Sequence, residues 1–413
     1  MTNCRLLLKS GGPLLAALLP LAGYAAAQPP APTFTTLYSG LNGANPVALG
    51  RGGVLYGTIY NFGNPSQAYS LTPPVSAGSP WTYTVILDND GFSPDGAFAI
   101  GGGGVLYGVD KMGGNSFCGS GCGVVYSLTP PASPGGAWVR STIFTFGTYT
   151  SPSGVVIGPG GVLYGSVTYP PGGVFSLTPP ASPGSPWTYN QLYTFTNGSD
   201  GADPSAVTVG SDGVLYGTTG QGGLRGVGCV SGCGTVFALA PPASSGGSWT
   251  ITVLHSFEGG SGDPYAGIGP SPLAIGEGGV LYGTVANDGN TSCTTFPGGC
   301  GTVFAVHPPS SPGGSWGFKT IYSFTGGIDG ANPSGGVVIA ENGELFGTAS
   351  QGGASGYGTI FSLTPPKTPL ASWTEAPLYS FPGSPGNPGS GVVLGAAGTL
   401  YGVTSSTVFS LTR

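Results

Sequence analysis

A Leu-aromatic-Gly tripeptide recurs along the chain and constrains the fold more than any other feature. Its seven copies begin at Leu55, Leu106, Leu163, Leu215, Leu281, Leu345 and Leu400. Around each copy lie four short segments in a constant order: a β-branched run, a Val-Leu-Tyr-Gly-Thr segment, a Val-Phe-Ser-Leu-Thr-Pro-Pro segment and a segment that opens on Trp. Each is rich in β-branched and aromatic residues and is bounded by turn residues, so each predicts a strand. Four short strands per repeat predict the blade of a β-propeller.

The first and last segments predict how the ring closes. Residues 34–39 form a fourth segment with no preceding third, and residues 408–411 form a third segment with no following fourth. An N-terminal strand that completes the last blade would leave no open sheet edge between the two ends. We therefore expect an all-β, seven-bladed propeller with four strands per blade, in which the N-terminal strand closes the last blade.

The composition excludes several other classes of protein. Gly (82 residues) and Pro (40 residues) are too abundant for a helical bundle, because both destabilise helix interiors. Only 6% of the residues are charged, and the net charge is −6. A nucleic-acid-binding protein needs a basic surface, so we expect no nucleic-acid partner.

The N-terminus predicts export. Arg5 and Lys9 precede an apolar run from Pro13 to Ala22, and Ala25–Ala27 resembles a signal-peptidase site. We expect residues 1–27 to be a cleaved signal peptide and residues 28–413 to be one propeller domain. No later segment is long and apolar enough for a membrane span. The mature protein is then secreted or held at the cell surface, and we expect a monomer.

The cysteines agree with export. Cys4 leaves with the signal peptide, and the other six form close pairs: Cys118/Cys122, Cys229/Cys233 and Cys293/Cys300. Paired cysteines in an exported chain predict disulfides. No His/Cys cluster suggests a metal site, so we expect no cofactor. The Asp-Gly-Ala turns at Asp200 and Asp329 leave Ca²⁺ binding as an alternative, because oxygen-rich loops suit that ion.

All six tryptophans occupy one register, at the start of the fourth segment: Trp81, Trp138, Trp187, Trp249, Trp316 and Trp373. A side chain placed identically in every repeat predicts packing between blades rather than ligand stacking.

The strand order and the Gly-Gly after the second strand resemble the kelch type of propeller. More specifically, residues 213–219 with 234–239, and residues 345–353 with 358–366, resemble the GloVer tandem repeat. This resemblance extends over nearly all of the mature chain. It implies an exported bacterial protein at the cell surface or outside the cell, in a family whose C-terminal anchors vary. It implies no activity.

Few residues suggest chemistry. His255 and His307 stand at repeat positions held by Tyr and Thr in other copies, which indicates structural roles. Asp110 and Lys111 break the repeat, and Arg225 is the nearest parallel in a later blade; departures from a repeat rule are candidate functional positions. We expect these three residues to contact a ligand and predict no catalytic residue.

The paired cysteines and long insertions fall between the second and third segments, on the rim that also carries the Asp/Asn-Pro turns. We call this the Cys-loop rim. Variable loops on a rigid scaffold suit binding. We therefore expect a non-enzymatic binding module for an extracellular glycan or an envelope protein. The alternatives are a carbohydrate-active enzyme that uses loop carboxylates on the same rim, and a structural matrix component. Product release would identify the enzyme, and saturable binding would exclude the matrix role.

Overall fold

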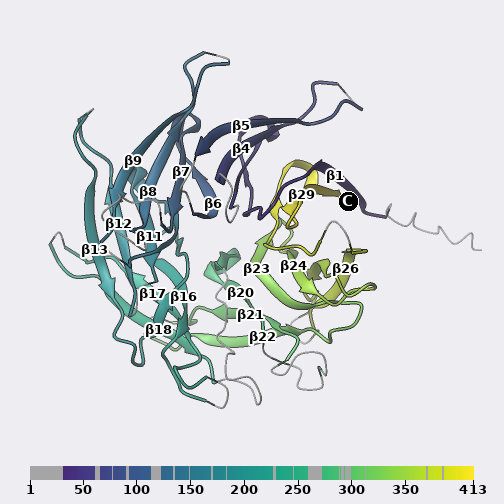
Figure 1. Cartoon of the computed structure of the whole chain (residues 1–413). Helices are drawn as coiled ribbons and strands as arrows, with labels where there is room; N and C mark the ends of the chain where they lie inside the picture. Colours follow the sequence, from purple (N-terminus) through teal and green to yellow (C-terminus); the bar gives the residue numbers. More distant parts are fainter. Residues whose placement is uncertain are drawn as a thin grey trace, which may run out of the picture. The chain divides into compact units, whose positions relative to one another are not determined.

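The computed structural model describes residues 31–413 except 61–65, 77, 90–92, 113–121, 134, 148, 169–170, 183, 227–228, 245, 259–271, 288, 290–292, 294–298, 312, 369–370 and 384–385. The segment predicted to be a signal peptide lies outside these residues. Pro32–Arg413 forms one compact unit, in which seven antiparallel sheets are arranged in a ring (Figure 1). The predicted blade number is confirmed.

Blades 1 to 6 run from an inner to an outer strand in chain order. Blade 1 consists of β2 (Ala48–Leu49), β3 (Leu55–Ile59), β4 (Ser66–Thr72) and β5 (Thr82–Asn89). Blade 2 consists of β6 (Pro94–Ile100), β7 (Leu106–Asp110), β8 (Val124–Thr129) and β9 (Val139–Thr145). Blade 3 consists of β10 (Pro152–Ile157), β11 (Leu163–Val167), β12 (Gly173–Thr178) and β13 (Thr188–Thr194).

Blade 4 has a divided inner strand, β14 (Ala202–Pro204) and β15 (Thr208–Val209), followed by β16 (Leu215–Gln221), β17 (Thr235–Ala240) and β18 (Thr250–Ser256). Blades 5 and 6 consist of β19 (Ala274–Ile275), β20 (Leu281–Val285), β21 (Thr302–His307) and β22 (Gly317–Ser323), and of β23 (Ala331–Ile339), β24 (Leu345–Gln351), β25 (Thr359–Thr364) and β26 (Thr374–Ser380). Blade 7 combines β27 (Val393–Leu394), β28 (Leu400–Val403) and β29 (Thr407–Thr412) with β1 (Thr33–Ser39).

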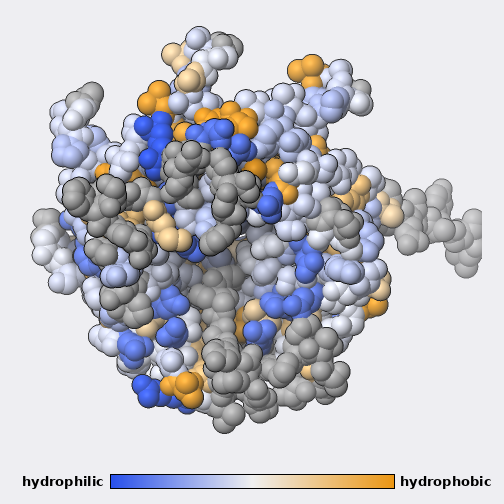
Figure 2. All heavy atoms as spheres, in the orientation of Figure 1, coloured by the Kyte–Doolittle hydropathy of each residue, from blue (hydrophilic) through white to orange (hydrophobic). Residues whose placement is uncertain are grey.

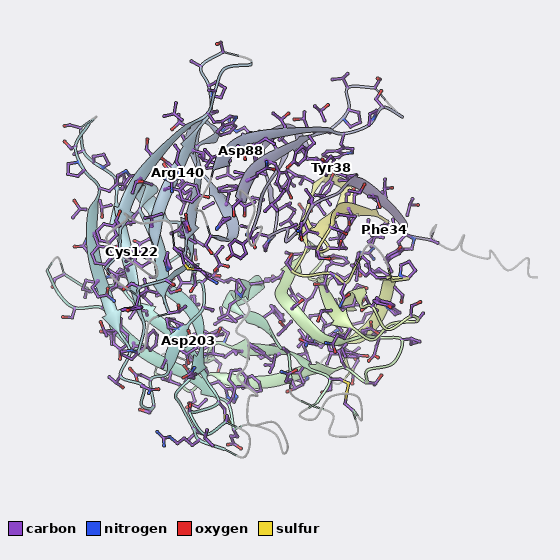
Figure 3. All side chains as sticks on the ribbon, viewed as in Figure 1. Phe34, Tyr38, Asp88, Cys122, Arg140 and Asp203 are labelled. Carbon is purple, nitrogen blue, oxygen red and sulfur yellow. A yellow bond between two sulfur atoms is a disulfide. The ribbon has the colours of Figure 1, made fainter. Side chains whose placement is uncertain are left out.

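The predicted closure of the ring is confirmed. β1 pairs antiparallel with β29, so the first strand of the chain is the outermost strand of blade 7 (Figure 1). The ring of Phe34 stacks on Tyr379 of blade 6 at 4.0 Å, and Tyr38 stacks on Tyr83 of blade 1 at 4.2 Å. Both side chains project from β1 (Figure 3). One strand therefore joins three blades.

In all seven copies of the Leu-aromatic-Gly repeat, glycine is needed for the same steric reason. It lies opposite a buried aromatic residue of the third strand, as Gly347 lies opposite Phe361. A Cβ on Gly347 would lie 2.5 Å from the Phe361 ring, closer than real contacts allow. The same relation joins Gly57 to Tyr69, Gly108 to Tyr126, Gly165 to Phe175, Gly217 to Phe237, Gly283 to Phe304 and Gly402 to Phe409.

The predicted role of the tryptophans is confirmed. Each contacts the tyrosine of the Leu-Tyr-Gly motif in the preceding blade, with ring centroids 5.8–6.1 Å apart. The pairs are Trp81–Tyr401, Trp138–Tyr56, Trp187–Tyr107, Trp249–Tyr164, Trp316–Tyr216 and Trp373–Tyr282. Five of the six are edge-to-face and one is tilted, which are geometries that the aromatic quadrupole favours.

The seam between blades 6 and 7 uses a cation instead of tryptophan. The guanidinium of Arg413 lies 4.8 Å from the ring of Phe346, and its two terminal nitrogens donate to the carboxylate of Glu344 at 2.8 and 3.0 Å. Glu344 is 6% exposed. A bidentate pair with a buried carboxylate is stronger than an exposed ion pair.

Arg413→Ala should lower the free energy of unfolding by about 1–2 kcal/mol, because it leaves the Glu344 carboxylate buried without its charged partner. The value is at the lower end because the Arg413 side chain is 37% exposed. Denaturant unfolding measures the effect, with exposed Arg51→Ala as the matched control. Equal midpoints for the two variants would contradict the role of Arg413 in closing the ring.

Candidate functional site

Two sets of loops meet on the Cys-loop rim, which consists of the connections from second to third strands and from each fourth strand to the next blade. The backbone N–H of Gly223 donates to the carbonyl of Gly198 at 2.8 Å, and that of Gly353 donates to Gly327 at 2.8 Å. In each pair, one residue belongs to a second-to-third connection and the other to the connection that enters the same blade. The turns therefore support the insertions that lie beside them.

Disulfides hold this rim. Cys229–Cys233 and Cys293–Cys300 are bonded as predicted, with Cα atoms 5.2 and 5.7 Å apart. All four residues are buried and pack in the seams beneath the loops. Cys122 is also buried and disulfide-bonded, whereas its predicted partner Cys118 lies outside the described residues. The two described disulfides favour an oxidising, extracellular environment.

A helix of the length and apolar character needed to cross a bilayer does not occur in the described part of the chain.

Asp110 ends β7 and is 0% exposed. Its Oδ1 accepts hydrogen bonds from the backbone N–H groups of Ser93, at 2.7 Å, and Met112, at 3.1 Å. Burial raises the pKa of this carboxyl, while these hydrogen bonds and the charge of Arg140 act in the opposite direction. Asp110 thus joins the start of the loop after β7 to the turn before β6.

Lys111 pairs with Asp95 rather than with Asp110, its neighbour in the sequence. Its Nζ lies 3.0 Å from Oδ2 of Asp95 on the inner strand of blade 2. Burial raises the pKa of Asp203 in blade 4, and the positive charge of Lys111 opposes this shift only in part. Arg225 is exposed on the loop after β16. The described contacts do not join Arg225 to Lys111, so the predicted ligand-contacting residues form two separate groups.

The acidic turns are satisfied internally. Oδ2 of Asp200 accepts from the Thr196 N–H at 2.8 Å and from the Tyr193 hydroxyl at 2.9 Å, and Oδ1 accepts from the Thr196 hydroxyl. Asp329 repeats this arrangement in blade 6 with Thr325 and Tyr322. Within the described ranges, no group of three or more His, Cys, Asp or Glu side chains is placed to hold a metal ion.

The histidines are in structural positions. His255 stacks on Phe318 of blade 5 at 3.7 Å and contacts Phe257 edge-on, so it replaces an aromatic ring in the seam. His307 is the exposed last residue of β21.

Exposed apolar side chains concentrate on the Cys-loop rim. Of the nine large hydrophobic residues exposed in the described chain, six lie in its loops: Met112, Tyr149, Leu224, Val230, Ile328 and Tyr357. Only Val75 lies in a loop of the opposite rim. On the face shown in Figure 2, apolar residues are visible at several places among more hydrophilic ones.

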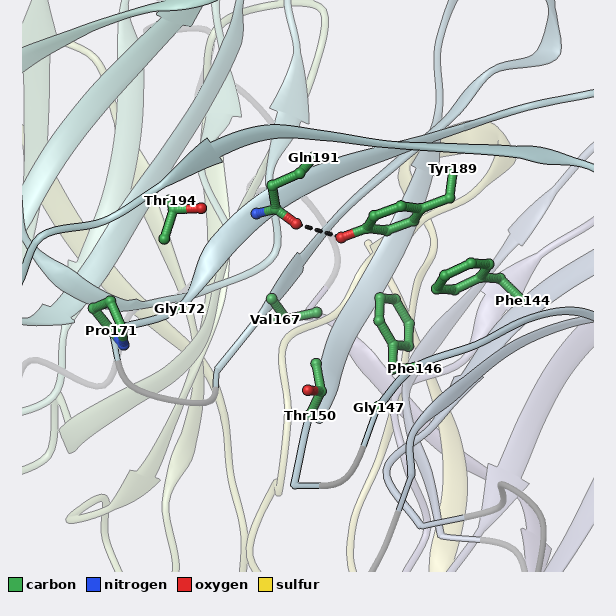
Figure 4. Close-up of a pocket in the computed structure, with 10 residues that line it drawn as sticks. All are labelled: Phe144, Phe146, Gly147, Thr150, Val167, Pro171, Gly172, Tyr189, Gln191 and Thr194. Atoms are coloured by element: carbon green, nitrogen blue, oxygen red, sulfur yellow. Dashed lines mark hydrogen bonds between the residues drawn. The ribbon is translucent and has the colours of Figure 1, made fainter. Parts of the chain in front are cut away.

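A pocket of about 520 Å³ opens on this rim, at the seam between blades 2 and 3 (Figure 4). Phe144, Phe146 and Tyr189 supply its aromatic wall, and Thr150, Gln191 and Thr194 supply hydroxyl and amide groups. The sequence interpretation did not identify this pocket. A signal was present: Gln191 stands where the repeat has Val253, Thr320 and Pro377 in blades 4 to 6.

Comparisons with known proteins agree with the repeat and the fold. Residues 269–411 match the Gloeobacter/Verrucomicrobia repeat. No curated protein matched the chain. A candidate 6-phosphogluconolactonase of Bacteroides uniformis aligns with a TM-score of 0.50 and 13% identity, over 80% of this chain and 84% of its own.

Two further solved structures are less similar in shape. A candidate 6-phosphogluconolactonase of Bacteroides fragilis has a TM-score of 0.49 and 13% identity, over 80% of this chain and 82% of its own. The PQQ domain of a Coprinopsis cinerea pyranose dehydrogenase has a TM-score of 0.45 and 12% identity, over 92% and 95%. At these identities the Bacteroides uniformis likeness concerns the fold alone, and the other two carry no argument.

The resemblance to the GloVer repeat is therefore confirmed where the match lies: residues 269–411, which supply blades 5 to 7 apart from β1, match the Gloeobacter/Verrucomicrobia repeat.

Proposed function

We propose that this protein is an exported binding module that holds an extracellular glycan on the Cys-loop rim. The observation that carries this proposal is the concentration of exposed apolar side chains in the loops of that rim. These loops are held by disulfides and by hydrogen bonds between blades. A rigid scaffold with exposed apolar loops is suited to recognition.

Two features favour binding over catalysis. The carboxylates of Asp200 and Asp329 are occupied by the hydrogen bonds that close their own turns. His255 is stacked on Phe318 in a seam between blades. A glycosidase needs two available carboxyl groups about 5–9.5 Å apart, and these acids do not supply such a pair.

A glycan is favoured over a protein partner by the pattern of the apolar residues. A stable protein interface buries about 800 Å² on each partner around a continuous apolar centre. The six exposed apolar residues of the rim come from the loops of different blades, which suits the small repeating units of a polysaccharide.

The test is a binding screen of residues 28–413, in oxidised form, against bacterial and plant polysaccharides and purified envelope proteins. It is run with and without Ca²⁺, and the supernatants are analysed for released sugars. Val230→Asp and Ile328→Asp should each weaken glycan binding at least about fivefold, because both side chains are exposed on the rim. Val75→Asp on the opposite rim is the matched control and should bind as the unaltered protein does.

Released oligosaccharide would replace this proposal with the enzyme alternative. Equal loss in Val75→Asp and in the two rim variants would contradict the assignment of binding to the Cys-loop rim. Saturable binding to an envelope protein alone, lost in the rim variants, would keep the rim and reject the glycan.

A further inference from the structure

The pocket between blades 2 and 3 is bordered by a short loop, in contrast to the long insertions of the next two blades. Blade 3 joins its second and third strands through residues 168–172, whereas blades 4 and 5 use residues 222–234 and 286–301. Pro171 and Gly172 of this short connection line the pocket, together with Val167 at the end of β11. The short connection therefore leaves this part of the rim uncovered by its own blade.

The apolar wall of the pocket is rigid. Phe144 of β9 and Tyr189 of β13 stack with their centroids 4.4 Å apart and their planes at 7°. Phe146 meets both rings edge-on, at 5.0 and 6.0 Å. Rings fixed by three mutual contacts lose little conformational freedom when a ligand binds. Phe144 and Tyr189 are half-buried, so part of each ring is accessible from the pocket.

The polar groups are positioned beside this wall. Oε1 of Gln191 accepts from the hydroxyl of Tyr189, and its Nε2 donates to the carbonyl of Tyr193 at 2.7 Å (Figure 4 shows the first bond). An amide has two N–H donors and two acceptor lone pairs, so each end retains one group for a ligand. Thr150 and Thr194 add hydroxyls that both donate and accept.

The charge of the pocket defines the class of ligand. Each described residue that lines it is uncharged. The ligand must therefore present an apolar face to the aromatic wall and neutral donors and acceptors to the amide and hydroxyls. A pyranose ring has both, because its C–H groups form an apolar face and its hydroxyls project at the edge. C–H contacts with an aromatic ring are individually weak, and the hydrogen bonds fix the orientation.

We infer that this pocket binds one pyranose unit of a neutral glycan, with the sugar ring against Phe144 and Tyr189 and its hydroxyls bonded to Gln191 and Thr194. This inference rests on the proposed function and assigns the ligand class and position. The volume of about 520 Å³ lies within the range of small-molecule sites and accommodates a sugar unit with its neighbours extending along the rim.

The test titrates neutral oligosaccharides (cello-, xylo- and manno-oligosaccharides) into oxidised protein by calorimetry, with oligogalacturonate as the charged comparison. Gln191→Ala should weaken neutral-oligosaccharide binding at least about tenfold, because it removes the amide that offers the pocket both a donor and an acceptor. Gln191 is exposed, so the fold should not change. Tyr189→Phe removes only the hydroxyl that orients Gln191 and should weaken binding by a smaller factor of about three.

Thr320→Ala is the matched control, because Thr320 is exposed at the same register of blade 5. Unchanged binding in Thr320→Ala together with loss in Gln191→Ala supports the inference. Full binding in Gln191→Ala, with loss in Ile328→Asp, overturns the pocket and leaves the proposed function standing. Preference for oligogalacturonate overturns the neutral class. If no saccharide binds, both the pocket assignment and the glycan proposal fail.

Discussion

Phe361→Ala is expected to lower the free energy of unfolding by about 3–5 kcal/mol, and Gly347→Ala by about 1–3 kcal/mol. Phe361 is 0% exposed and lies directly across β24 and β25 from Gly347. Removing the ring leaves a cavity in the core between blades 5 and 6, whereas adding a methyl group to Gly347 pushes against the ring. Denaturant unfolding followed by tryptophan fluorescence measures both changes.

The two substitutions should also be coupled. In the double variant, the methyl group added at position 347 enters space that the ring has left, so the loss should be smaller than the sum of the single losses. Gly102→Ala is the matched control, because a Cβ there would meet no atom within 4 Å. If Gly347→Ala destabilised the protein no more than Gly102→Ala, the contact with Phe361 would not explain the glycine of the repeat.

The repeat explains why the fold was predictable. Six of the seven seams contain Trp at the same register, so the Trp–Tyr contacts and the strand order could be inferred from several independent copies. The paired cysteines lie a few residues apart, so local disulfides required no knowledge of the fold. The missing fourth strand could be inferred because every other copy had one.

The candidate site was less predictable because its residues come from different strands and blades. Lys111 follows Asp110 in the sequence but pairs with Asp95 across the sheet. Asp110 broke the repeat for a local reason, since its carboxylate receives the N–H groups of Ser93 and Met112. The pocket depends on which outer residues of blade 2 face blade 3, and on a loop length that the repeat does not fix.

The seam that contains Glu375 should make stability depend on pH. Glu375 of β26 occupies the register held by Tyr83, Tyr189 and Phe318 in other blades. Its Oε1 is buried and has no hydrogen-bond partner among the described residues. The hydroxyl of Tyr322 donates to Asp329 at 3.0 Å and also interacts with Glu375, so its single proton faces two carboxylates.

Burial, together with the negative charge of Asp329, raises the pKa of Glu375 from its ordinary 4.5 to about 7, although the Tyr322 hydroxyl acts in the opposite direction. The folded protein therefore holds this proton more tightly than the unfolded chain does. The contribution of this proton to the free energy of unfolding is fully present below about pH 4.5 and is lost as the pH rises through about 7. Glu375→Gln, which removes the charge, should leave the melting temperature nearly unchanged at about pH 5 and raise it by several degrees at about pH 8.

Blade 4 provides a matched seam without the second carboxylate. Tyr193 donates to Asp200 just as Tyr322 donates to Asp329, and Ile251 stands where blade 6 has Glu375. Ile251→Glu should therefore introduce a second seam of the same kind and lower the free energy of unfolding at about pH 8 by about 2 kcal/mol. The loss should be smaller at about pH 5, where the introduced carboxyl group is protonated.

Melting temperatures measured from about pH 5 to about pH 8.5 for the unaltered protein and both variants test this expectation. The difference between Glu375→Gln and the unaltered protein should grow with pH, because only the unaltered protein must ionise a carboxyl group beside Asp329. Ile251→Glu should instead melt at a progressively lower temperature than the unaltered protein as the pH rises. Parallel curves for all three proteins would show that neither seam position titrates in this range. If the melting temperature depended on pH only in Ile251→Glu, Glu375 would be better hydrated than its partly buried position beside Tyr322 indicates, and its raised pKa would be contradicted.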